Sequence, residues 1–210
     1  MLRISLSTLL VAAAVALPFT AGGSAARAES PKGEPIRVRG SVANLEGGTL
    51  SVKTREGQIV SVALPQGSMV SGVARAAISD IKPGDYVGIA SLPTKEGGDG
   101  ALEVLIFPPA LKGIGEGSYG WDLKPNSTMT NATVADAVTA VSGRTVMLSY
   151  QGRQKKIAIP EGTPVVTLAA ATEADLKPGA AVFIAGEKAP GGAITARQVV
   201  VGTNGVVPPM

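Results

Sequence analysis

The sequence predicts an all-β protein made of two similar small domains in tandem. Three observations lead to this prediction. Apolar and polar residues alternate along several segments, which is the period of a β-strand. The 27 glycines and 15 prolines among 210 residues interrupt these segments at short intervals, as they do in turns. A Lys-Pro-Gly turn followed by an apolar run occurs twice, in residues 81–87 (IKPGDYV) and 176–182 (LKPGAAV).

Residues 1–28 are predicted to be a signal peptide that does not belong to the fold. Arg3 supplies a positive start, residues 4–17 are almost wholly apolar, and Ala26-Arg27-Ala28 fits the small-x-small pattern of a cleavage site. The apolar stretch is short for a membrane span, which needs about 20 residues; a retained anchor is the alternative. We expect export to the periplasm or the extracellular space, residues 29–35 as a linker, and no membrane span after cleavage.

Charge and missing residue types exclude several functions. Arg3 and Arg27 leave with the signal peptide, so 17 of the 19 basic residues remain against 16 acidic ones. Proteins that bind nucleic acid usually carry a strong basic excess, so we expect no nucleic-acid partner. The 210 residues include no cysteine and no histidine, which excludes disulfides, thiolate chemistry, a Ser-His-Asp triad and a His-ligated zinc. We expect no enzyme activity, no cofactor and no metal site.

Residues 36–107 and 132–201 are predicted to be two copies of one repeat. At an offset of 95, residues 64–67 (LPQG) lie opposite residues 159–162 (IPEG), and the two Lys-Pro-Gly turns lie opposite each other. A similarity over this length with few gaps indicates an internal duplication. We therefore expect each copy to bury its own aliphatic interior.

Upstream of Gly57 the best offset becomes 96, which aligns Val38 with Val134 and Val42 with Val138. One residue is then missing from a turn of the second copy. Loops between strands tolerate such changes, so the shift is compatible with duplication.

The first copy is predicted to contain five strands and a short helix. The alternation places three strands before the helix and two after it, at about residues 36–42, 50–54, 60–64, 85–91 and 101–107. An Ala-rich piece at about residues 74–81 is the predicted helix, which Pro83 helps to end. This order suits a small closed barrel of the oligonucleotide/oligosaccharide-binding (OB) type. The predicted architecture is therefore two tandem OB-like β-barrels, each with a short helix; a split sandwich is the alternative.

Residues 108–131 (PPALKGIGEGSYGWDLKPNSTMTN) have no counterpart in either copy and are predicted to be an irregular Gly-rich connector, and residues 202–210 a C-terminal tail. The only tryptophan, Trp121, lies in the connector with Tyr119, Glu116 and Asp122. An aromatic ring in such a loop suits stacking on a sugar ring or another flat ligand; packing between the barrels is the alternative. We predict these four side chains to be ligand- or partner-binding residues.

Asp85 and Tyr86 complete the predicted binding residues. At the offset of 95, Ala180 and Ala181 stand in their places in the second copy, so the turn can fold without them. We expect a surface role that only the first copy performs. Sequence drift at exposed positions after duplication is the alternative.

The stretch GEGSYGWDLKPNSTMTNATV resembles a segment in a family of exported bacterial proteins of uncharacterised function. The resemblance is carried by Trp121, Asp122, Leu123 and residues 127–131, and it extends over most of the chain after the signal peptide. The family's repeats are similar to a domain of unknown function with an OB-like barrel, so the resemblance implies tandem barrels of that type. In that family a histidine often follows the Gly-Glu-Gly motif. This chain has Ser118 at that position.

These observations favour an exported, non-enzymatic binding or interaction module of the bacterial envelope, with an envelope protein or a glycan as partner. A structural envelope component is the alternative. A periplasmic metal-binding protein is a third hypothesis, in which Met69, Met129 and Met147 would bind Cu(I) through thioethers alone. A glycoside hydrolase would need a carboxylate pair such as Glu116 and Asp122. The ligand, the partner and the oligomeric state do not follow from the sequence.

Overall fold

The computed structural model describes residues 33–95, 97–140 and 143–209, which belong to one compact unit. The predicted signal peptide and most of the predicted linker lie outside the described residues. The described residues form thirteen β-strands and three 3-10 helices of three residues each, without an α-helix among them. The prediction of an all-β fold is therefore confirmed.

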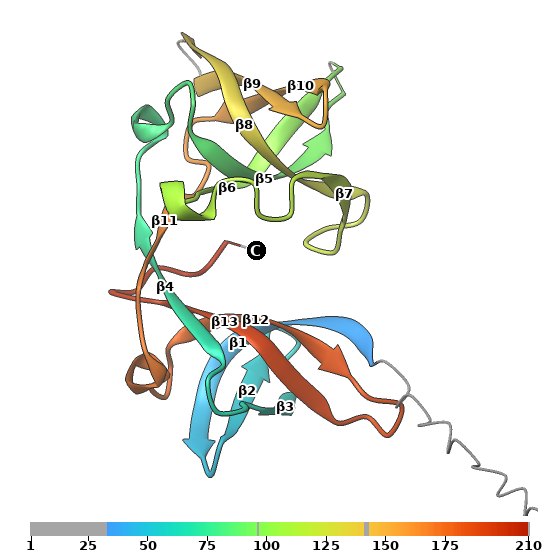
Figure 1. The fold of residues 1–210 in the computed structure, drawn as a ribbon, viewed down its shortest axis with the longest axis vertical. Helices are drawn as coiled ribbons and strands as arrows, with labels where there is room; N and C mark the ends of the chain where they lie inside the picture. Colours follow the sequence, from blue (N-terminus) through green and yellow to red (C-terminus); the bar gives the residue numbers. More distant parts are fainter. Residues whose placement is uncertain (1–32, 96, 141–142, 210) are drawn as a thin grey trace, which may run out of the picture. The chain divides into compact units, whose positions relative to one another are not determined.

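The N-terminal half of the fold, residues 34–106, contains six strands and one 3-10 helix (Figure 1). In chain order they are β1 (Glu34–Glu46), β2 (Thr49–Thr54), β3 (Ile59–Ala63), β4 (Met69–Arg75), η1 (Ile78–Asp80), β5 (Tyr86–Pro93) and β6 (Asp99–Ile106).

The connector and the C-terminal half follow. The connector contains η2 (Pro109–Leu111) and β7 (Gly117–Trp121). The C-terminal half, residues 127–202, consists of β8 (Ser127–Ala140), β9 (Gly143–Tyr150), β10 (Arg153–Pro160), β11 (Val165–Ala170), η3 (Glu173–Asp175), β12 (Ala181–Lys188) and β13 (Ile194–Gly202).

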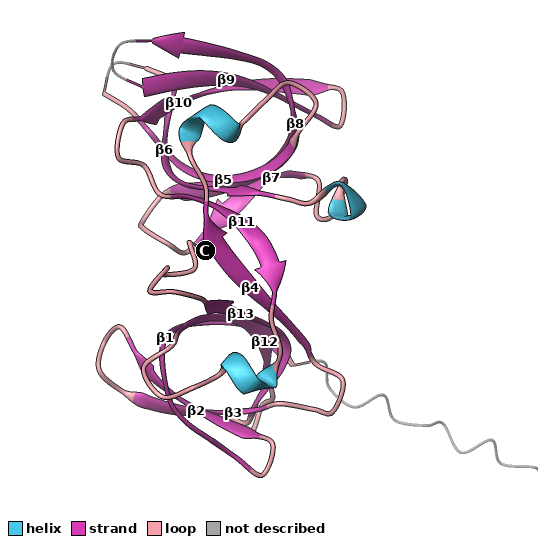
Figure 2. Cartoon of the chain, turned by 90° about the vertical axis from the view of Figure 1, so that its left-hand side faces the viewer, coloured by secondary structure: helices cyan, strands magenta, loops and turns pink. Residues whose placement is uncertain are grey.

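The strands pair across the two halves. Group A consists of β1, β2 and β3 from the N-terminal half with β12 and β13 from the C-terminal half. Four antiparallel pairings run β13–β12–β1–β2–β3, and a parallel pairing of β3 with β13 returns to the start. Group B repeats this cycle with β6, β5, β8, β9 and β10. The strands of each group curve around a common centre in Figure 2.

Each half thus gives its last two strands to the other half. The core of group A joins Val52 and Val62 of the N-terminal half to Ile184 and Val199 of the C-terminal half, and the core of group B is mixed in the same way. The expectation that each copy buries its own interior is therefore wrong. All the strands except β7 lie on one continuous path of paired strands, to which β7 is attached through β8.

Strands β4 and β11 carry the chain from one group to the other, and the sequence analysis missed both as strands. They pair antiparallel with Leu168 opposite Val73, and each also pairs parallel with the last strand of a group, β4 with β13 and β11 with β6. The predicted helix at about residues 74–81 is correspondingly wrong in extent, because β4 runs to Arg75 and only Ile78–Asp80 is helical. Strand pairing along both edges of β4 outweighs the preference of the alanines in this segment for a helix.

The exchange follows an approximate two-fold symmetry at an offset of 95 residues. Val199 pairs with Val70, and Val104 pairs with Val165 in the same way. Val73 and Leu168 are 95 positions apart and lie opposite each other, so the pairing of β4 with β11 has the same symmetry.

The two Lys-Pro-Gly turns hold the exchanged strands in place. Gly84 has a φ of 91° and Gly179 a φ of 86°, which glycine adopts without steric cost. The N–H of Gly84 donates to the carbonyl of Val134 in the other half, and the N–H of Gly179 donates to the carbonyl of Val42. The repeated turn therefore marks the point where each half docks onto the other.

The alignment of the first strands at an offset of 96 is wrong. Val42 pairs with Val52 just before a β-bulge, and Val134 pairs with Leu148 just before the equivalent bulge. Val42 therefore corresponds to Val134, at an offset of 92. The paired residues are 10 positions apart in the first hairpin and 14 in the second, so the four additional residues of the second hairpin lie in its outer part.

The connector is more regular than predicted. Residues 117–121 form β7, which pairs antiparallel with the start of β8, Trp121 opposite Ser127 and Gly117 opposite Asn131. The side chain of Ser127 donates to the carbonyl of Trp121 and closes this hairpin. Strand β8 accordingly begins upstream of residue 132, the predicted start of the second copy, and only the earlier, Gly-rich part of the connector lacks a strand.

Candidate functional site

The predicted binding residues lie in different places, and the structure brings only some of them together. Tyr119 and Trp121 line a pocket between groups A and B, and Asp122 lies beside it. Asp85 and Tyr86 line a separate cleft.

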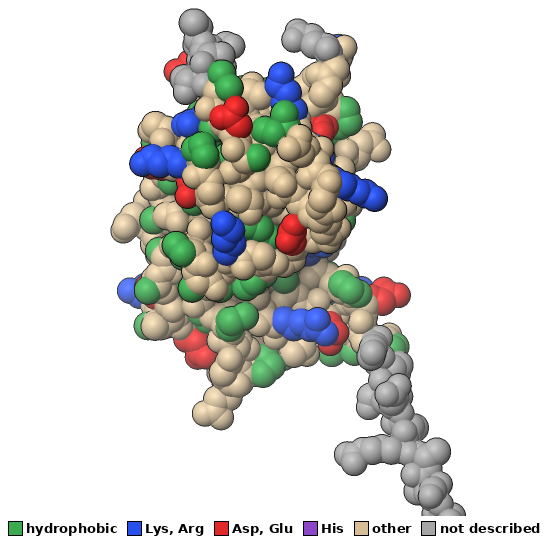
Figure 3. Space-filling model, turned by 45° about the horizontal axis from the view of Figure 1, so that its top comes forward, with side chains coloured by type: hydrophobic (Ala, Val, Ile, Leu, Met, Phe, Trp, Pro, Cys, Tyr) green, Lys and Arg blue, Asp and Glu red, His purple; other side chains and the backbone are tan. Residues whose placement is uncertain are grey.

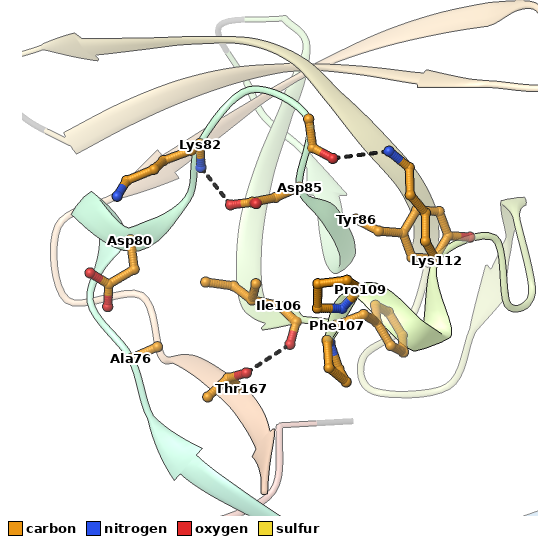
Figure 4. Close-up of a pocket in the computed structure, with 12 residues that line it drawn as sticks. Ala76, Asp80, Lys82, Asp85, Tyr86, Ile106, Phe107, Pro109, Lys112 and Thr167 are labelled. Carbon is orange, nitrogen blue, oxygen red and sulfur yellow. Dashed lines mark hydrogen bonds between the residues drawn. The ribbon is translucent and has the colours of Figure 1, made fainter.

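The side cleft has a volume of about 630 Å³ and lies between the Lys-Pro-Gly turn of the N-terminal half and the start of the connector (Figure 4). The polar groups along its upper wall already have partners. Asp85 accepts a hydrogen bond from the N–H of Lys82 at 2.8 Å, and the ammonium of Lys112 donates to the carbonyl of Gly84 at 3.1 Å. Asp80 accepts from the N–H of Ala77. These contacts shape the turn and attach the connector to it.

Tyr86 is buried, with 3% of its surface exposed, so the expected surface role is wrong for this residue. Its hydroxyl donates to the carbonyl of Ile114 at 3.0 Å, and its ring packs on Phe107 with centroids 5.4 Å apart. Burial, followed by the nearby Glu116 and Tyr119, raises the pKa of Tyr86 to about 12. Tyr86 therefore stays a neutral donor that holds the connector. Ala181 replaces it in the C-terminal half, which has no connector to hold.

Glu116 also serves to fasten the connector. Its carboxylate accepts a hydrogen bond from the backbone N–H of Gln151 at 2.7 Å, and the Gln151 side chain donates to the carbonyl of Glu116 at 3.0 Å. Gln151 has a φ of 47° in the β9–β10 turn. The carboxylate that the sequence analysis paired with Asp122 is therefore bound to group B, whereas Asp122 is bound to arginines of group A.

Trp121 lies at the junction of the two groups under a layer of arginines. Its ring stacks on Phe183 with centroids 6.3 Å apart, and the guanidinium of Arg37 lies 4.0 Å above its ring centre. Arg39 lies 5.7 Å from the same ring and 5.2 Å from that of Phe183. These are cation–π distances. The tryptophan thus packs between groups, the alternative that the sequence analysis left open, and it also forms part of a pocket wall.

Asp122 fixes the two arginines over the tryptophan. Its carboxylate accepts a hydrogen bond from Arg39 at 2.7 Å and lies 3.7 Å from Arg37. Partial burial alone would raise the pKa of Asp122, but the hydrogen bond from Arg39 and the charges of both arginines outweigh it and lower that pKa. At neutral pH the carboxylate is ionised and neutralises part of the arginine charge.

The central pocket is a cavity of about 390 Å³ between groups A and B. Aromatic and aliphatic side chains from both groups and from the connector form most of its wall, among them Phe107, Phe183, Leu105, Met129, Leu168, Tyr119 and Trp121. Three of its lining residues are exposed apolar side chains, Met69, Ile114 and Tyr119. The volume and the apolar lining are typical of pockets that bind small molecules.

Two polar side chains of this pocket contain buried atoms without a partner. Oε1 of Glu103 and Nε1 of Trp121 form no hydrogen bond within the part of the chain that the structure describes. Glu103 lies on β6 with 7% of its surface exposed. Burial raises the pKa of Glu103 to about 7, although the charges of Arg39 and Arg55 lower it. A buried polar group without a partner costs about 1–3 kcal/mol, so these two side chains are unusual for a structural core.

The sequence analysis missed Glu103, although the sequence contains a signal for it. Glu103 stands two residues before the buried Leu105, whose side chain packs with Phe183 at the junction of the two groups, so it lies on the side of its strand that faces the junction. At the offset of 95 its counterpart is Gln198, which lines the same pocket. A polar residue at this position in both halves is unusual beside a buried apolar cluster.

The C-terminal tail covers the other side of Glu103. The chain returns between the two groups after β13 (Figure 1), and Pro208 and Pro209 are buried there. Glu103 and residues 205–209 also line a neighbouring hollow of about 570 Å³. Gly202 is required at the start of the tail, because a Cβ at this position would lie 1.7 Å from the carbonyl oxygen of Val206.

In the described ranges, no group of three or more acidic, cysteine or histidine side chains is placed to hold a metal ion. Basic and acidic side chains are interspersed on the face shown in Figure 3. No helix within the described residues is long and apolar enough to cross a membrane.

Three comparisons with known proteins add no family, relative or structural neighbour: no family model, no curated protein and no solved structure matches the chain. The candidate site therefore depends on geometry alone.

Proposed function

We propose that the protein is a non-enzymatic binding module and that its ligand occupies the central pocket, against Tyr119 and Trp121 of the connector. The observation that supports this most directly is a mainly apolar cavity with two buried, unpartnered polar atoms in its lining side chains. Native cores rarely leave such atoms unpaired. A ligand that fills the cavity would shield the exposed apolar side chains at its edge.

The same proposal includes the architecture that positions the pocket. Groups A and B are two OB-like barrels that arose by duplication and exchanged their last two strands. Five strands in a closed cycle, with the parallel pair between the third and the last, support the OB assignment. The recurrence of the pairings at an offset of 95 supports the duplication.

The site of action is proposed to be the periplasm or the extracellular space, as the signal-peptide pattern and the resemblance to exported bacterial proteins predict. In that setting the ligand would be a component of the cell envelope. The contacts of Glu116 and Asp122 argue against the hydrolase hypothesis, because both carboxylates already bind other groups of the fold.

Binding of the neutral, apolar dye N-phenyl-1-naphthylamine to the purified protein tests the proposal. Dye fluorescence should rise on binding, and emission from the single Trp121 should change in parallel. The variant Ala185→Phe, which adds a ring inside the pocket, should weaken dye binding at least tenfold. Ala63→Phe is the matched control, because Ala63 is exposed on β3. Equal binding to both variants, or none to the wild type, would refute the pocket and favour a structural envelope component.

A further inference from the structure

We propose that group A has a second binding site, at residues 35–39 of β1, which takes an extended peptide segment of a partner protein as an additional β-strand. The peptide pairs antiparallel with β1 and carries apolar side chains at alternate positions, with acidic side chains between them. The floor of this site consists of four aliphatic residues that do not line the central pocket, so the inference goes beyond the proposed function.

One edge of β1 lacks a partner strand at residues 34–39. Strand β12 pairs along one edge of this segment, and β2 pairs with the opposite edge only from Gly40 onward, so that no described strand continues β2 along this segment. The carbonyl of Arg39 faces the β2 side, because it accepts a hydrogen bond from the N–H of Arg55. Peptide groups point alternately to the two sides of a strand, so the N–H and the carbonyl of Arg37 face this vacant edge as well.

In group B the equivalent edge is occupied by β7. At the offset of 92 that relates β1 to β8, residues 35–39 correspond to residues 127–131. Residues 128–131 have β5 on one side and β7 on the other, whereas their counterparts have β12 on one side and no described strand on the other. Group B therefore shows which kind of segment completes this edge, namely an antiparallel strand of five residues.

Beside β7, the end of group B is closed by a polar network. The ammonium of Lys155 donates to the hydroxyls of Thr128 at 3.1 Å and Thr130 at 3.4 Å. The same ammonium lies 3.0 Å from the carboxylate of Asp99, and the hydroxyl of Ser118 on β7 lies 2.9 Å from that of Thr130. These side chains are partners of one another, so this end of group B is complete without a ligand.

The corresponding end of group A is apolar. By strand register, Lys155, Asp99, Thr128 and Thr130 correspond to Val60, Ile194, Ile36 and Val38. All four aliphatic residues line a cavity of about 370 Å³, and Ile36 and Val60 are only partly buried. On β7 the residues opposite Thr130 and Thr128 are Ser118 and Gly120. Apolar side chains at these two positions of an added strand would remove the floor from water.

The charged residues around this cavity are mainly basic. They are Arg37, Arg39, Arg55, Lys188, Glu56 and Asp122. Asp122 binds Arg39 and lies near Arg37, whereas Arg55 and Lys188 form no salt bridge with a described residue. Opposite charges that face each other across two strands attract. The basic excess therefore favours acidic side chains opposite Arg37 and Arg39.

The combination of a vacant strand edge and an apolar floor defines an extended peptide as the partner. Peptides that add a strand to a sheet gain affinity from main-chain hydrogen bonds and specificity from the contacts of alternate side chains. Arg37 supplies the main-chain groups, and the cavity between β1, β3 and β13 receives the alternate side chains.

Titration of the purified protein with the synthetic peptide acetyl-Ser-Glu-Val-Glu-Val-Glu-Ser-amide tests the site. We expect saturable binding in calorimetry. Binding should be at least tenfold weaker when lysine replaces each glutamate, when serine replaces each valine, or when the central glutamate is N-methylated and cannot donate to β1. No saturable binding of the first peptide, or equal binding of the altered peptides, would overturn the inference.

Amide hydrogen exchange followed by NMR locates the bound peptide. The N–H of Arg37 should exchange at least tenfold more slowly in the complex, whereas that of Val38, which faces β12, should stay the same. An unchanged rate at Arg37 would place the peptide elsewhere and overturn the site. Protection of this N–H without peptide would also overturn it, because a second copy or residues before 33 would then occupy the edge; sedimentation separates these two cases.

Substitution of the floor tests the side-chain contacts. Val60→Gln should weaken binding of the first peptide at least fivefold, and Ile59→Gln, at an exposed neighbouring position of β3, should change it less than twofold. Circular dichroism checks that both variants fold. If Val60→Gln does not fold, Ile36→Thr, which introduces the residue of group B at this position, takes its place with the same expectation. Equal affinities of floor variant and control would overturn the role of the apolar floor.

Discussion

The two halves of the fold have the same strands and exchange the same two strands, yet they differ at the positions that face the junction between groups A and B. The N-terminal half has Tyr86, Gly88, Glu103 and Phe107, where the C-terminal half has Ala181, Phe183, Gln198 and Gly202. Each half has one phenylalanine and one glycine in this set, in exchanged positions. The exchanged phenylalanine and glycine, together with Tyr86 in place of alanine, make the shape of the junction asymmetric.

The asymmetry follows from the chain segments that leave each half. After β6 the chain continues into the connector, which Tyr86 holds through Ile114. After β13 it continues into the tail, for which Gly202 leaves space. Gly88 in turn makes room for Phe107 and Asn131, which a Cβ at this position would approach to 3.2 and 2.8 Å. Two halves with the same order of strands thus form an asymmetric junction, because the chain leaves each of them differently.

The largest expected effect comes from separating the halves. A chain of residues 33–107 keeps β5 and β6 but lacks β8, on which β5 pairs, and lacks the strands that close group A. We expect it to be unfolded as a monomer and to gain β structure only as a dimer at high concentration. Circular dichroism combined with sedimentation checks this. A folded monomer would show that a half can close on itself and would remove the exchange as a requirement for folding.

The second largest effect is expected for Glu103→Gln, which gives the N-terminal half the glutamine that the C-terminal half has at the equivalent position. The pKa of Glu103 is raised from 4.5 to about 7 in the folded protein, so the folded state binds its proton more tightly than the unfolded state. The contribution of Glu103 to the free energy of unfolding is therefore greatest below pH 4.5 and falls by about 3 kcal/mol as the pH rises through about 7.

Glu103→Gln should remove this loss, so that its advantage over the wild type in urea unfolding grows between pH 5 and pH 8. The control is Glu161→Gln at an exposed position, for which we expect no such trend. Parallel pH profiles for wild type and Glu103→Gln would contradict the buried, unpaired carboxylate.

The third prediction concerns the tail. In Gly202→Val the new side chain would collide with the carbonyl of Val206 and displace the tail, with a loss of about 2 kcal/mol of stability, as for other overpacked sites. Protease cleavage after residue 202, detected by mass spectrometry, should become faster. Gly120→Ala is the control, because no atom lies within 4 Å of its Cβ position. A tail that stays protected in Gly202→Val would mean that its docking does not need this glycine.

The smallest effect is expected for the link between Tyr86 and the connector. Tyr86→Phe keeps the ring on Phe107 but removes the hydrogen bond to the carbonyl of Ile114, at a cost of about 1 kcal/mol. Hydrogen exchange of residues 112–117 should increase, while that of β9 should stay the same. Exchange that rises equally in both regions would indicate general destabilisation and not a loosened connector.

Local sequence signals predicted the strands well and the site partly. The alternation of Val38, Val42, Val52 and Val62 identifies inward positions, and all four side chains are buried in the core of group A. Tyr119 and Trp121, which line the candidate site, were recognisable as candidates because they are rare aromatics in a segment without a counterpart. Glu103 and Tyr86 were not assigned correctly, because their roles depend on contacts with segments far away in the sequence.

No local pattern in the sequence indicates that the two halves exchange strands. Because the two halves carry equivalent apolar patterns, β5 and β6 would bury the same side chains against β1–β3 of their own half as they bury against β8–β10. Only the seven residues of β4 and the six of β11, paired with each other and with β13 and β6, direct the chain to the other group. A periodicity analysis does not distinguish the two arrangements.

By itself, the sequence determined that this chain forms strands, where glycine and proline turn it, and that chemistry based on thiols or imidazole is absent. Those properties depend on residue type and on spacing along a few residues. The tertiary structure decided which half each strand completes, that Tyr86 holds the connector, and that Oε1 of Glu103 has no hydrogen-bond partner among the described residues. These properties depend on which surfaces meet, and identical patterns in the two halves leave that choice to long-range packing.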